Sequence, residues 1–159
     1  MKLAISTAEG EFTAHYSERG LAQLDFPGDT RSHTSDTHTP LQARPWHTIT
    51  TRALEKILAG QDPDELPPLD LSCGTGFQRR VWQALLKIRA GRTKSYAEVA
   101  EAIVNPKATR AVGCACGANP IPVLIPCHRV LAAKGRIGGF SSGPDWKHKL
   151  LAREGVQLC

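Results

Sequence analysis

The sequence predicts an α/β (α+β) protein in two parts: a small N-terminal β-meander with one helix, then a mainly helical, winged helix-turn-helix-like part. Three observations lead to this prediction. Short apolar segments separated by turn residues fill the first 26 residues, helix start signals recur in the second half, and the charge changes sign between the halves. Residues 1–70 carry 6 Lys/Arg and 11 Asp/Glu, whereas residues 71–159 carry 14 Lys/Arg and 4 Asp/Glu.

The N-terminal part begins with three expected strands, because Glu9-Gly10 and Arg19-Gly20 supply the turns between apolar segments at 3–5, 12–16 and 21–26. The polar residues 27–44 are expected to form a long loop. Apolar residues at helical spacing then predict a helix from Trp46 to Leu58 that stops at Gly60.

A Pro-rich linker at 62–68 separates the acidic part from the basic part. We therefore expect an N-terminal α/β domain over residues 1–70 and a C-terminal domain over residues 71–159. A basic domain beside an acidic one indicates a polyanionic partner such as nucleic acid, although solvated surface charge would look the same.

Helix start signals predict three helices in the C-terminal part. Capping boxes at Thr75–Gln78 and Ser95–Glu98 predict two helices, the second running to about Ile103. Asn105 can cap a third helix, with Pro106 at its first position and an end near Gly117. The second and third helices, joined by a short turn, form a plausible helix-turn-helix.

The third helix is almost without bulk, since Ala108, Ala111, Gly113 and Ala115 recur along it, beside the basic residues Lys107 and Arg110. Helices that read the major groove usually carry long polar side chains. A smooth helix instead favours close approach to the narrower minor groove and the DNA backbone. The alternative is that the small residues allow tight packing on a neighbouring helix.

Composition limits the class of protein and its compartment. No apolar run reaches the ~20 residues of a membrane helix, and the N-terminus has no secretory signal, so a cytoplasmic protein without membrane contact is expected. The five cysteines are expected to be free thiols in that compartment, with Cys114 and Cys116 buried. The spacing of Cys and His residues matches no metal-site pattern, so no metal is expected.

The most reactive pattern is Pro126-Cys127-His128-Arg129-Val130, which follows a stretch at 121–124 that is expected to be extended. Cationic neighbours such as His128 and Arg129 lower the pKa of a thiol and raise the fraction of thiolate, a soft nucleophile suited to a saturated carbon. Adjacent side chains on an extended chain point apart, so contact between Cys127 and His128 needs a turn or a bridging water.

The pattern does not stand alone, and from Phe77 to Gly155 the chain resembles the O6-alkylguanine-DNA alkyltransferases. The matching pieces occur in that family's order and spacing: Phe77-Gln78, Val81-Trp82, Ser95-Tyr96, Asn105-Pro106-Lys107-Ala108, Arg110-Ala111-Val112-Gly113, Asn119-Pro120, the cysteine motif, Ser141, Leu150-Leu151 and Glu154-Gly155. The resemblance implies DNA repair by direct, irreversible transfer of a methyl or alkyl group from O6-alkylguanine to Cys127, the reaction of a methylated-DNA–protein-cysteine S-methyltransferase.

The resemblance also implies roles for individual residues. Cys127 is the alkyl acceptor, His128 the base acting through a bound water, and Glu154 the residue that orients and charge-stabilises His128. Tyr96 donates a hydrogen bond to the guanine and can protonate the departing base. Asn119 braces the turn that carries the cysteine.

On the DNA side, the resemblance makes Arg110 a finger that fills the base stack after the damaged nucleotide has rotated out. The carbonyls of Cys127 and Val130 read the guanine amino group, and backbone amides near Ser141 hold its O6. The residues expected to contact substrate or DNA are Ser95, Lys107, Ala108, Arg110, Ala111, Gly113, Arg129, Val130, Phe140 and Ser141. The partner is double-stranded DNA containing O6-alkylguanine, bound by a monomer that needs no cofactor.

The sequence departs from the family at some positions, and other functions fit it less well. Some relatives bind zinc through N-terminal Cys and His, but no cysteine precedes Cys73, so zinc is not expected. Phe140 stands where many relatives have Tyr. A non-enzymatic, alkyltransferase-like damage-recognition protein lacks the acceptor cysteine, which is present here. A Cys-His hydrolase has no other support, and a helix-turn-helix regulator usually carries a bulkier recognition helix.

Overall fold

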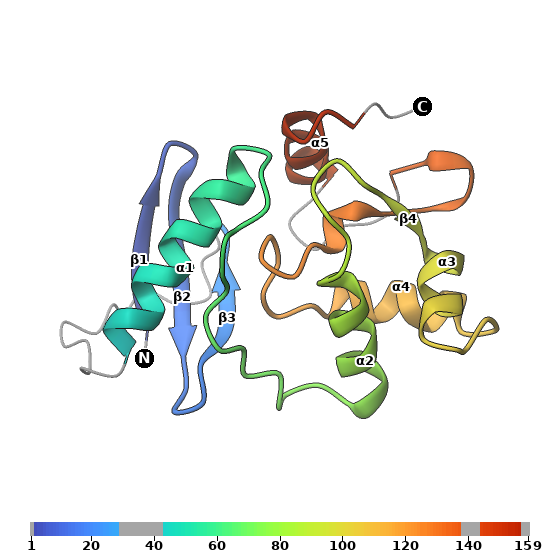
Figure 1. Cartoon of the computed structure of the whole chain (residues 1–159), viewed down its shortest axis with the longest axis horizontal. Helices are drawn as coiled ribbons and strands as arrows, with labels where there is room; N and C mark the ends of the chain where they lie inside the picture. The colour runs from blue at the N-terminus through green and yellow to red at the C-terminus, as the bar shows by residue number, and fades with distance from the viewer. Residues whose placement is uncertain (1, 29–42, 138–143, 157–159) are drawn as a thin grey trace.

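The computed structural model describes residues 2–28, 43–137 and 144–156. Two groups of elements lie side by side: a three-stranded sheet with α1 on one face, and the helices of the second half (Figure 1). The helix α5 (Pro144–Arg153) lies between these groups and contacts α1. This arrangement confirms the α+β organisation that the sequence predicts.

The sheet is an antiparallel meander in the order β1-β2-β3, formed by Lys2–Thr7, Gly10–Tyr16 and Leu21–Asp25. Alternate residues of β2, including Phe12, Ala14 and Tyr16, are buried, as the period of two of a half-buried strand requires. The helix α1 (Ala43–Leu58) buries a stripe that includes Ala53, Leu54 and Ile57. It begins earlier than the predicted start at Trp46, inside the segment expected to be loop.

The described residues of the second half form four α-helices and a small parallel ladder. The order is α2 (Gly76–Leu85), β4 (Lys94–Ser95), α3 (Tyr96–Ala102), α4 (Thr109–Gly117), the 3₁₀ turn η1 (Cys127–Arg129), β5 (Val130–Leu131), η2 (Ala133–Gly135) and α5. The ladder pairs β4 with β5 and so brings the start of α3 beside the end of η1. Residues far apart in the sequence thereby meet around Cys127.

The two halves share one hydrophobic core. Phe12 and Phe26 of the N-terminal half pack against Trp146 of α5. The Phe12 ring lies edge-on with its centroid 5.8 Å from that of Trp146, and the tilted Phe26 ring lies 4.9 Å away. The edge strand β3 is held by a backbone bond from Leu24 N to Pro120 O of 2.9 Å. The N-terminal half therefore packs directly against the segments that surround the cysteine motif.

Both predicted capping boxes are confirmed: the hydroxyls of Thr75 and Ser95 accept from the backbone amides of Gln78 and Glu98. The predicted cap at Asn105 is wrong, because α4 begins only at Thr109. Val104 takes a left-handed conformation with φ of 59°, which ends α3 and turns the chain, and residues 105–108 form a separate turn.

The stretch 121–124 is not extended as expected. Ile125 N bonds to Ile121 O at 2.9 Å, and Val123 lies at φ of 75°, so the chain makes a tight buried turn before the cysteine. Across the described part of the chain, no helix is both long and apolar enough to cross a bilayer.

Candidate active site

The loop before Cys127 is held by one buried amide side chain. Asn119 donates from Nδ2 to Ile125 O at 2.8 Å and accepts at Oδ1 from Ile121 N at 3.0 Å. These bonds close the turn at its two ends, and this compensates for the strained conformation of Val123. The turn delivers Cys127 to the start of η1, where its side chain is only 3% exposed.

His128 and Glu154 form a fully buried pair. His128 Nε2 lies 3.0 Å from Glu154 Oε1, and both side chains are completely inaccessible to solvent. An ionised carboxylate can only accept, so Nε2 carries the ring proton and donates it. In the neutral ring Nδ1 is then a free acceptor. Among the described residues it is the one buried side-chain nitrogen or oxygen atom without a hydrogen-bond partner. The geometry leaves His128 with a lone pair available to take a proton.

Arg129 is placed differently from the expectation that it contacts DNA. Its side chain is 3% exposed and holds Glu154 through Nε at 3.0 Å and Nη2 at 2.7 Å, while Nη1 donates to Ile88 O at 2.6 Å. A guanidinium used in this way inside the protein cannot reach a phosphate. Arg129 therefore holds Glu154 in place, and its expected role in DNA contact is corrected.

The acid–base properties of the site also differ from the expectation for Cys127. Burial raises the pKa of the Cys127 thiol to about 11, although a hydrogen bond with Asn119 and the charge of Lys147 act in the opposite direction. The expectation of a lowered pKa is therefore wrong, because the effect of burial is the larger one. The resting thiol is therefore protonated near neutral pH.

The pKa of His128 is lowered below its ordinary 6.5, since burial disfavours the imidazolium more than Glu154 favours it. Burial alone would raise the pKa of Glu154, but hydrogen bonds from His128 and Arg129 outweigh it and lower the value. At neutral pH the pair is thus a neutral imidazole donating to a carboxylate.

Lys147 is a buried residue that the sequence analysis missed. Its side chain is 0% exposed, and Nζ donates to Val130 O at 2.7 Å and lies 6.0 Å from the centre of the Tyr96 ring. Its ammonium charge favours the thiolate of Cys127. Lys147 lies on α5, whereas Glu154 follows the last residue of that helix, and we find no signal in the sequence that identifies Lys147.

Tyr96 and Ser95 stand at the junction of β4 and α3. Tyr96 is half-buried, and burial raises the pKa of its hydroxyl, with the nearby Cys116 and Cys127 contributing. The hydroxyl of Ser95 accepts from Glu98 N at 3.0 Å and is therefore engaged in capping the helix. Phe140 and Ser141, also expected at the site, lie outside the described residues.

The helix-turn-helix prediction agrees with α3 and α4, which pack against each other. One face of α4 is buried through Val112, Ala115 and Cys116, and Trp82 Nε1 donates to Ala115 O at 2.8 Å. The outer face and the preceding turn carry exposed Lys107, Arg110, Ala111 and Cys114, with Ala108 and Gly113 partly exposed. The expected burial of Cys116 is confirmed, and that of Cys114 is wrong.

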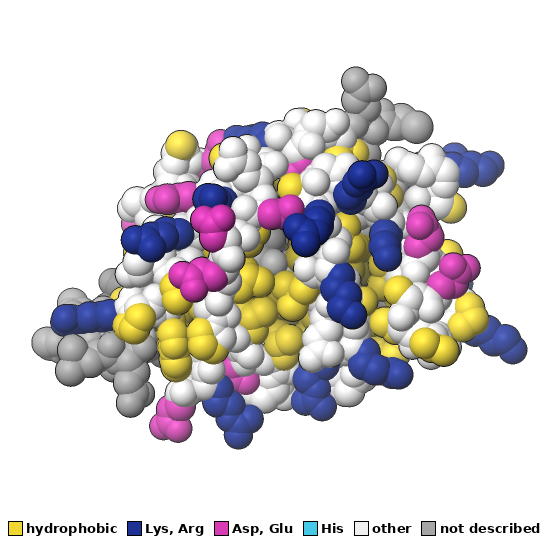
Figure 2. Space-filling view, in the orientation of Figure 1, with side chains coloured by type: hydrophobic (Ala, Val, Ile, Leu, Met, Phe, Trp, Pro, Cys, Tyr) yellow, Lys and Arg dark blue, Asp and Glu magenta, His cyan; other side chains and the backbone are white. Residues whose placement is uncertain are grey.

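Gly113, on the outer face of α4, is not required for packing. A Cβ built on Gly113 would meet nothing within 4 Å, so a larger residue would fit without a clash. The face is smooth and open, as close approach to another molecule requires. Lys and Arg side chains gather on the side of the molecule formed by the second half, whereas acidic residues are more frequent over α1 and the sheet (Figure 2).

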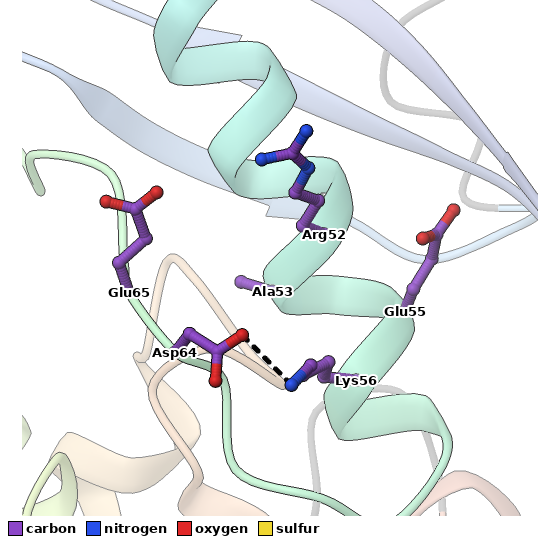
Figure 3. Close-up of a pocket in the computed structure, with 6 residues that line it drawn as sticks. All are labelled: Arg52, Ala53, Glu55, Lys56, Asp64 and Glu65. Atoms are coloured by element: carbon purple, nitrogen blue, oxygen red, sulfur yellow. Dashed lines mark ion pairs between the residues drawn. The ribbon is translucent and has the colours of Figure 1, made fainter.

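Other candidate sites are weaker. A cavity of about 180 Å³ between α1 and the linker is lined by charged residues and crossed by a Lys56–Asp64 ion pair of 3.0 Å (Figure 3). It contains no nucleophile and is small for a ligand site. Within the described ranges, no three His, Cys, Asp or Glu side chains gather to hold a metal ion.

Comparison with known proteins places this site in a family. A methylated-DNA–protein-cysteine methyltransferase of Methanosarcina acetivorans is 47% identical over 108 residues, covering 66% of this chain and 67% of the relative. One from Mycobacterium leprae is 48% identical over 105 residues, covering 66% and 63%. Among these and similar curated relatives, the match covers from 51% to 67% of the relative's length.

The fold extends over nearly the whole chain in solved structures. A Mycobacterium tuberculosis OGT in complex with DNA superposes with a TM-score of 0.79 at 38% identity, covering 95% of this chain and 90% of that one. An O6-methylguanine-DNA methyltransferase from Pyrococcus kodakaraensis gives 0.68 at 25% identity, covering 98% of each chain. A family model described as 6-O-methylguanine DNA methyltransferase, DNA binding domain, matches residues 76–156, and the chain therefore belongs to the 6-O-methylguanine DNA methyltransferase family.

Proposed function

We propose that this chain repairs double-stranded DNA by moving an alkyl group from O6 of guanine to Sγ of Cys127. The Sγ–carbon bond forms as the carbon–O6 bond breaks, and the product is a thioether. Because a thioether does not hydrolyse, each molecule acts once. The observation that carries the proposal is the buried Cys127 beside the His128–Glu154 pair, in a chain of this family.

Activation of the thiol is the first requirement of this reaction. A pKa of about 11 leaves roughly one thiol in 10⁴ ionised at neutral pH. A preformed thiolate is therefore too rare, and a base must act within the site. We assign this role to Nδ1 of His128, through a bound water, with Glu154 stabilising the imidazolium that forms.

Three further residues support the same transfer. The Lys147 ammonium favours the thiolate, and Asn119 fixes the turn that presents it. We propose that Tyr96 hydrogen-bonds to the guanine and supplies the proton that the departing base needs. The carbonyls of Cys127 and Val130 are proposed to read the guanine amino group. Each already accepts one hydrogen bond, and a carbonyl oxygen has a second lone pair.

The DNA interface is proposed to be the outer face of α4 with the preceding turn. Its exposed Lys107 and Arg110 supply positive charge, while the small residues Ala108, Ala111 and Gly113 permit close approach through the minor groove. The target carbon is inaccessible within the duplex, so the nucleotide must be extruded. Arg110 is proposed to fill the gap. Ser95 stays a proposed contact with substrate or DNA, and Phe140 and Ser141 stay proposals for the pocket wall.

We further propose that residues 71–159 form the DNA-binding and acceptor domain, and residues 1–70 a supporting α/β domain. The protein is proposed to act as a cytoplasmic monomer without a cofactor. Four free cysteines among the described residues fit a reducing compartment.

Intact-mass spectrometry tests the reaction directly. The protein is mixed with an equimolar duplex containing one O6-methylguanine, and the expected result is one added methyl that maps to the peptide containing Cys127. The Cys127→Ser variant is the matched control and is expected to bind the duplex without gaining mass. An unchanged mass of the wild-type protein with retained binding would favour the damage-recognition function instead.

A further inference from the structure

Glu154 follows the last residue of α5. Residues of the N-terminal half contact the preceding residue, Arg153. Arg153 pairs with Glu9 of the β1–β2 turn and donates from Nη1 to Leu58 O, at the end of α1, at 3.1 Å. Glu9 also accepts from Lys149, one helical turn earlier on α5, at 3.3 Å. The residue next to the buried carboxylate is thus held by two separate elements of residues 1–70.

Gly60 also lies close to the backbone at this point. It follows α1 at φ of +82°, and a Cβ built on it would lie 2.0 Å from Arg153 O and 3.2 Å from Glu154 N. Contacts of that length with backbone atoms cannot be relieved by rotating a side chain. Any residue larger than glycine would therefore push the backbone at 153–154 away from its position.

Asp62 is linked to the Glu154 carboxylate through Arg129. Its Oδ1 accepts from Ala90 N at 3.0 Å and lies 3.6 Å from Arg129 Nη1. Arg129 in turn holds both oxygens of Glu154. The turn 60–62 thus touches the backbone that carries Glu154 and the guanidinium that pairs with it.

We propose that the turn 60–62 is a positioning element that sets where the Glu154 carboxylate stands against His128, with Gly60 as its central residue. This inference rests on the proposed function, in which that pair activates Cys127. It gives residues 1–70 a part in the chemistry although none of them touches the reacting atoms. Gly60 is a positioning residue, acting through the backbone of Arg153 and Glu154.

The first test compares Gly60→Ala with Gly28→Ala. Gly28 has nearly the same φ, +81°, but a Cβ there meets nothing within 4 Å, so this control carries the same backbone cost without the contact. Single-turnover methyl transfer is measured with saturating duplex, and duplex affinity separately. Misplacement of a reacting group by about 1 Å can cost roughly 10²-fold in rate. We expect a loss of 10- to 100-fold for Gly60→Ala with unchanged affinity, and no loss for Gly28→Ala. Equal rates for both variants overturn the proposal.

A double-mutant cycle shows whether Gly60 acts through the pair. In a His128→Gln background the ion pair between Glu154 and Arg129 is retained. Gly60→Ala should then cause no further loss of transfer rate. A loss of full size in that background would mean that Gly60 acts elsewhere, and would refute the assignment.

The pH profile separates positioning from general damage. His128 is faced by Glu154 and Lys147 on the α5 side and by Arg129 on η1, and Glu154 raises its pKa. Moving Glu154 away should shift the acid limb of the rate profile to lower pH, whereas partial unfolding would scale the rate equally at all pH values. An unshifted limb contradicts the inference.

A milder variant covers the case in which Gly60→Ala does not fold. Arg153→Met removes the ion pair with Glu9 and the hydrogen bond to Leu58 O. Arg52→Met, which removes an exposed arginine from α1, is the control. We expect a rate loss of at least about 3-fold for the first only, and equal rates refute the proposal. The downfield NMR signal of the His128 Nε2 proton gives a readout without activity. It should weaken in Arg153→Met even if the wild-type chain gains no methyl, an outcome that would reject the proposed function alone.

Discussion

Replacing Glu154 with glutamine removes one negative charge from a fully buried network and keeps its shape. In the wild-type protein the carboxylate accepts from His128 at 3.0 Å and from Arg129 at 2.7, 3.0 and 3.1 Å. The glutamine amide nitrogen would face a donor on at least one side, because both partners donate. Glu154→Gln should therefore affect stability and chemistry together.

The stability cost follows from the burial of Arg129. Its guanidinium is 3% exposed, and Asp62, which is partly exposed, is its other acidic neighbour at 3.6 Å. Removing one partner of a buried ion pair typically costs about 3–5 kcal/mol. Because the amide oxygen still accepts one bond from Arg129, we expect the lower end, about 3 kcal/mol, in urea unfolding.

The kinetic cost follows from the role of His128 as base. A positioned general base contributes roughly 10²–10⁴-fold. Glutamine preserves a contact to His128 but supplies no charge to stabilise the imidazolium, so we expect the single-turnover rate to fall by about 10²-fold. Duplex affinity should not change, since Glu154 is inaccessible to solvent.

Methyl transfer is timed with saturating duplex at a temperature where unfolding curves show the variant to be fully folded. Glu55→Gln, an exposed carboxylate on α1, is the matched control and should behave as wild type. If folded Glu154→Gln transfers at the wild-type rate, His128 does not act through this carboxylate, and the activation scheme is wrong.

Four further predictions concern other parts of the molecule. Lys147→Met should raise the pKa of the acceptor thiol further and slow transfer by a similar factor at each pH near neutrality, as timed transfer at several pH values will reveal. Val104→Gly should stabilise the fold by about 1 kcal/mol in urea unfolding, because a β-branched residue at φ of 59° is strained. The pKa values of His128 and Glu154 are both lowered in the folded state, so the unfolded chain binds protons first on acidification. The stability that this pair contributes should therefore be complete above about pH 7, fall as the pH drops below 6.5, and fall again below 4.5, as unfolding curves across this range will test. Arg110→Ala should slow transfer from duplex DNA more than from a free alkylated base, and equal losses would contradict its role in the base stack.

Sequence reasoning succeeded where local chemistry decides the structure. The capping boxes at Thr75 and Ser95 need only residues three positions apart, and both form as predicted. The cap at Asn105 failed because Val104 takes a left-handed conformation after α3 and residues 105–108 form a separate turn, so α4 begins only at Thr109. The extended stretch at 121–124 failed for a similar reason, since the bonds from Asn119 hold it in a turn.

At the site, the sequence indicates which side chains are chemically able but not which are buried. Arg129 was expected at the DNA because it is basic and lies beside the cysteine, whereas its partner Glu154 is 25 residues away along the chain. Lys147 was missed because an isolated lysine usually lies on the surface. Both residues became informative only when the fold placed them inside the protein.

Burial alone works against the proposed reaction, and this explains why two further charges lie in the core. It raises the pKa of Cys127 and lowers that of His128, and each unit of difference makes proton transfer from thiol to imidazole about 1.4 kcal/mol less favourable. The transfer creates a thiolate and an imidazolium. Lys147 favours the thiolate, and Glu154 favours the imidazolium. The two charges therefore offset the cost of burying the thiol and the imidazole. A buried carboxylate must be held by its surroundings, and the contacts of Gly60 and Arg129 with its backbone and oxygens provide that support from both halves of the chain.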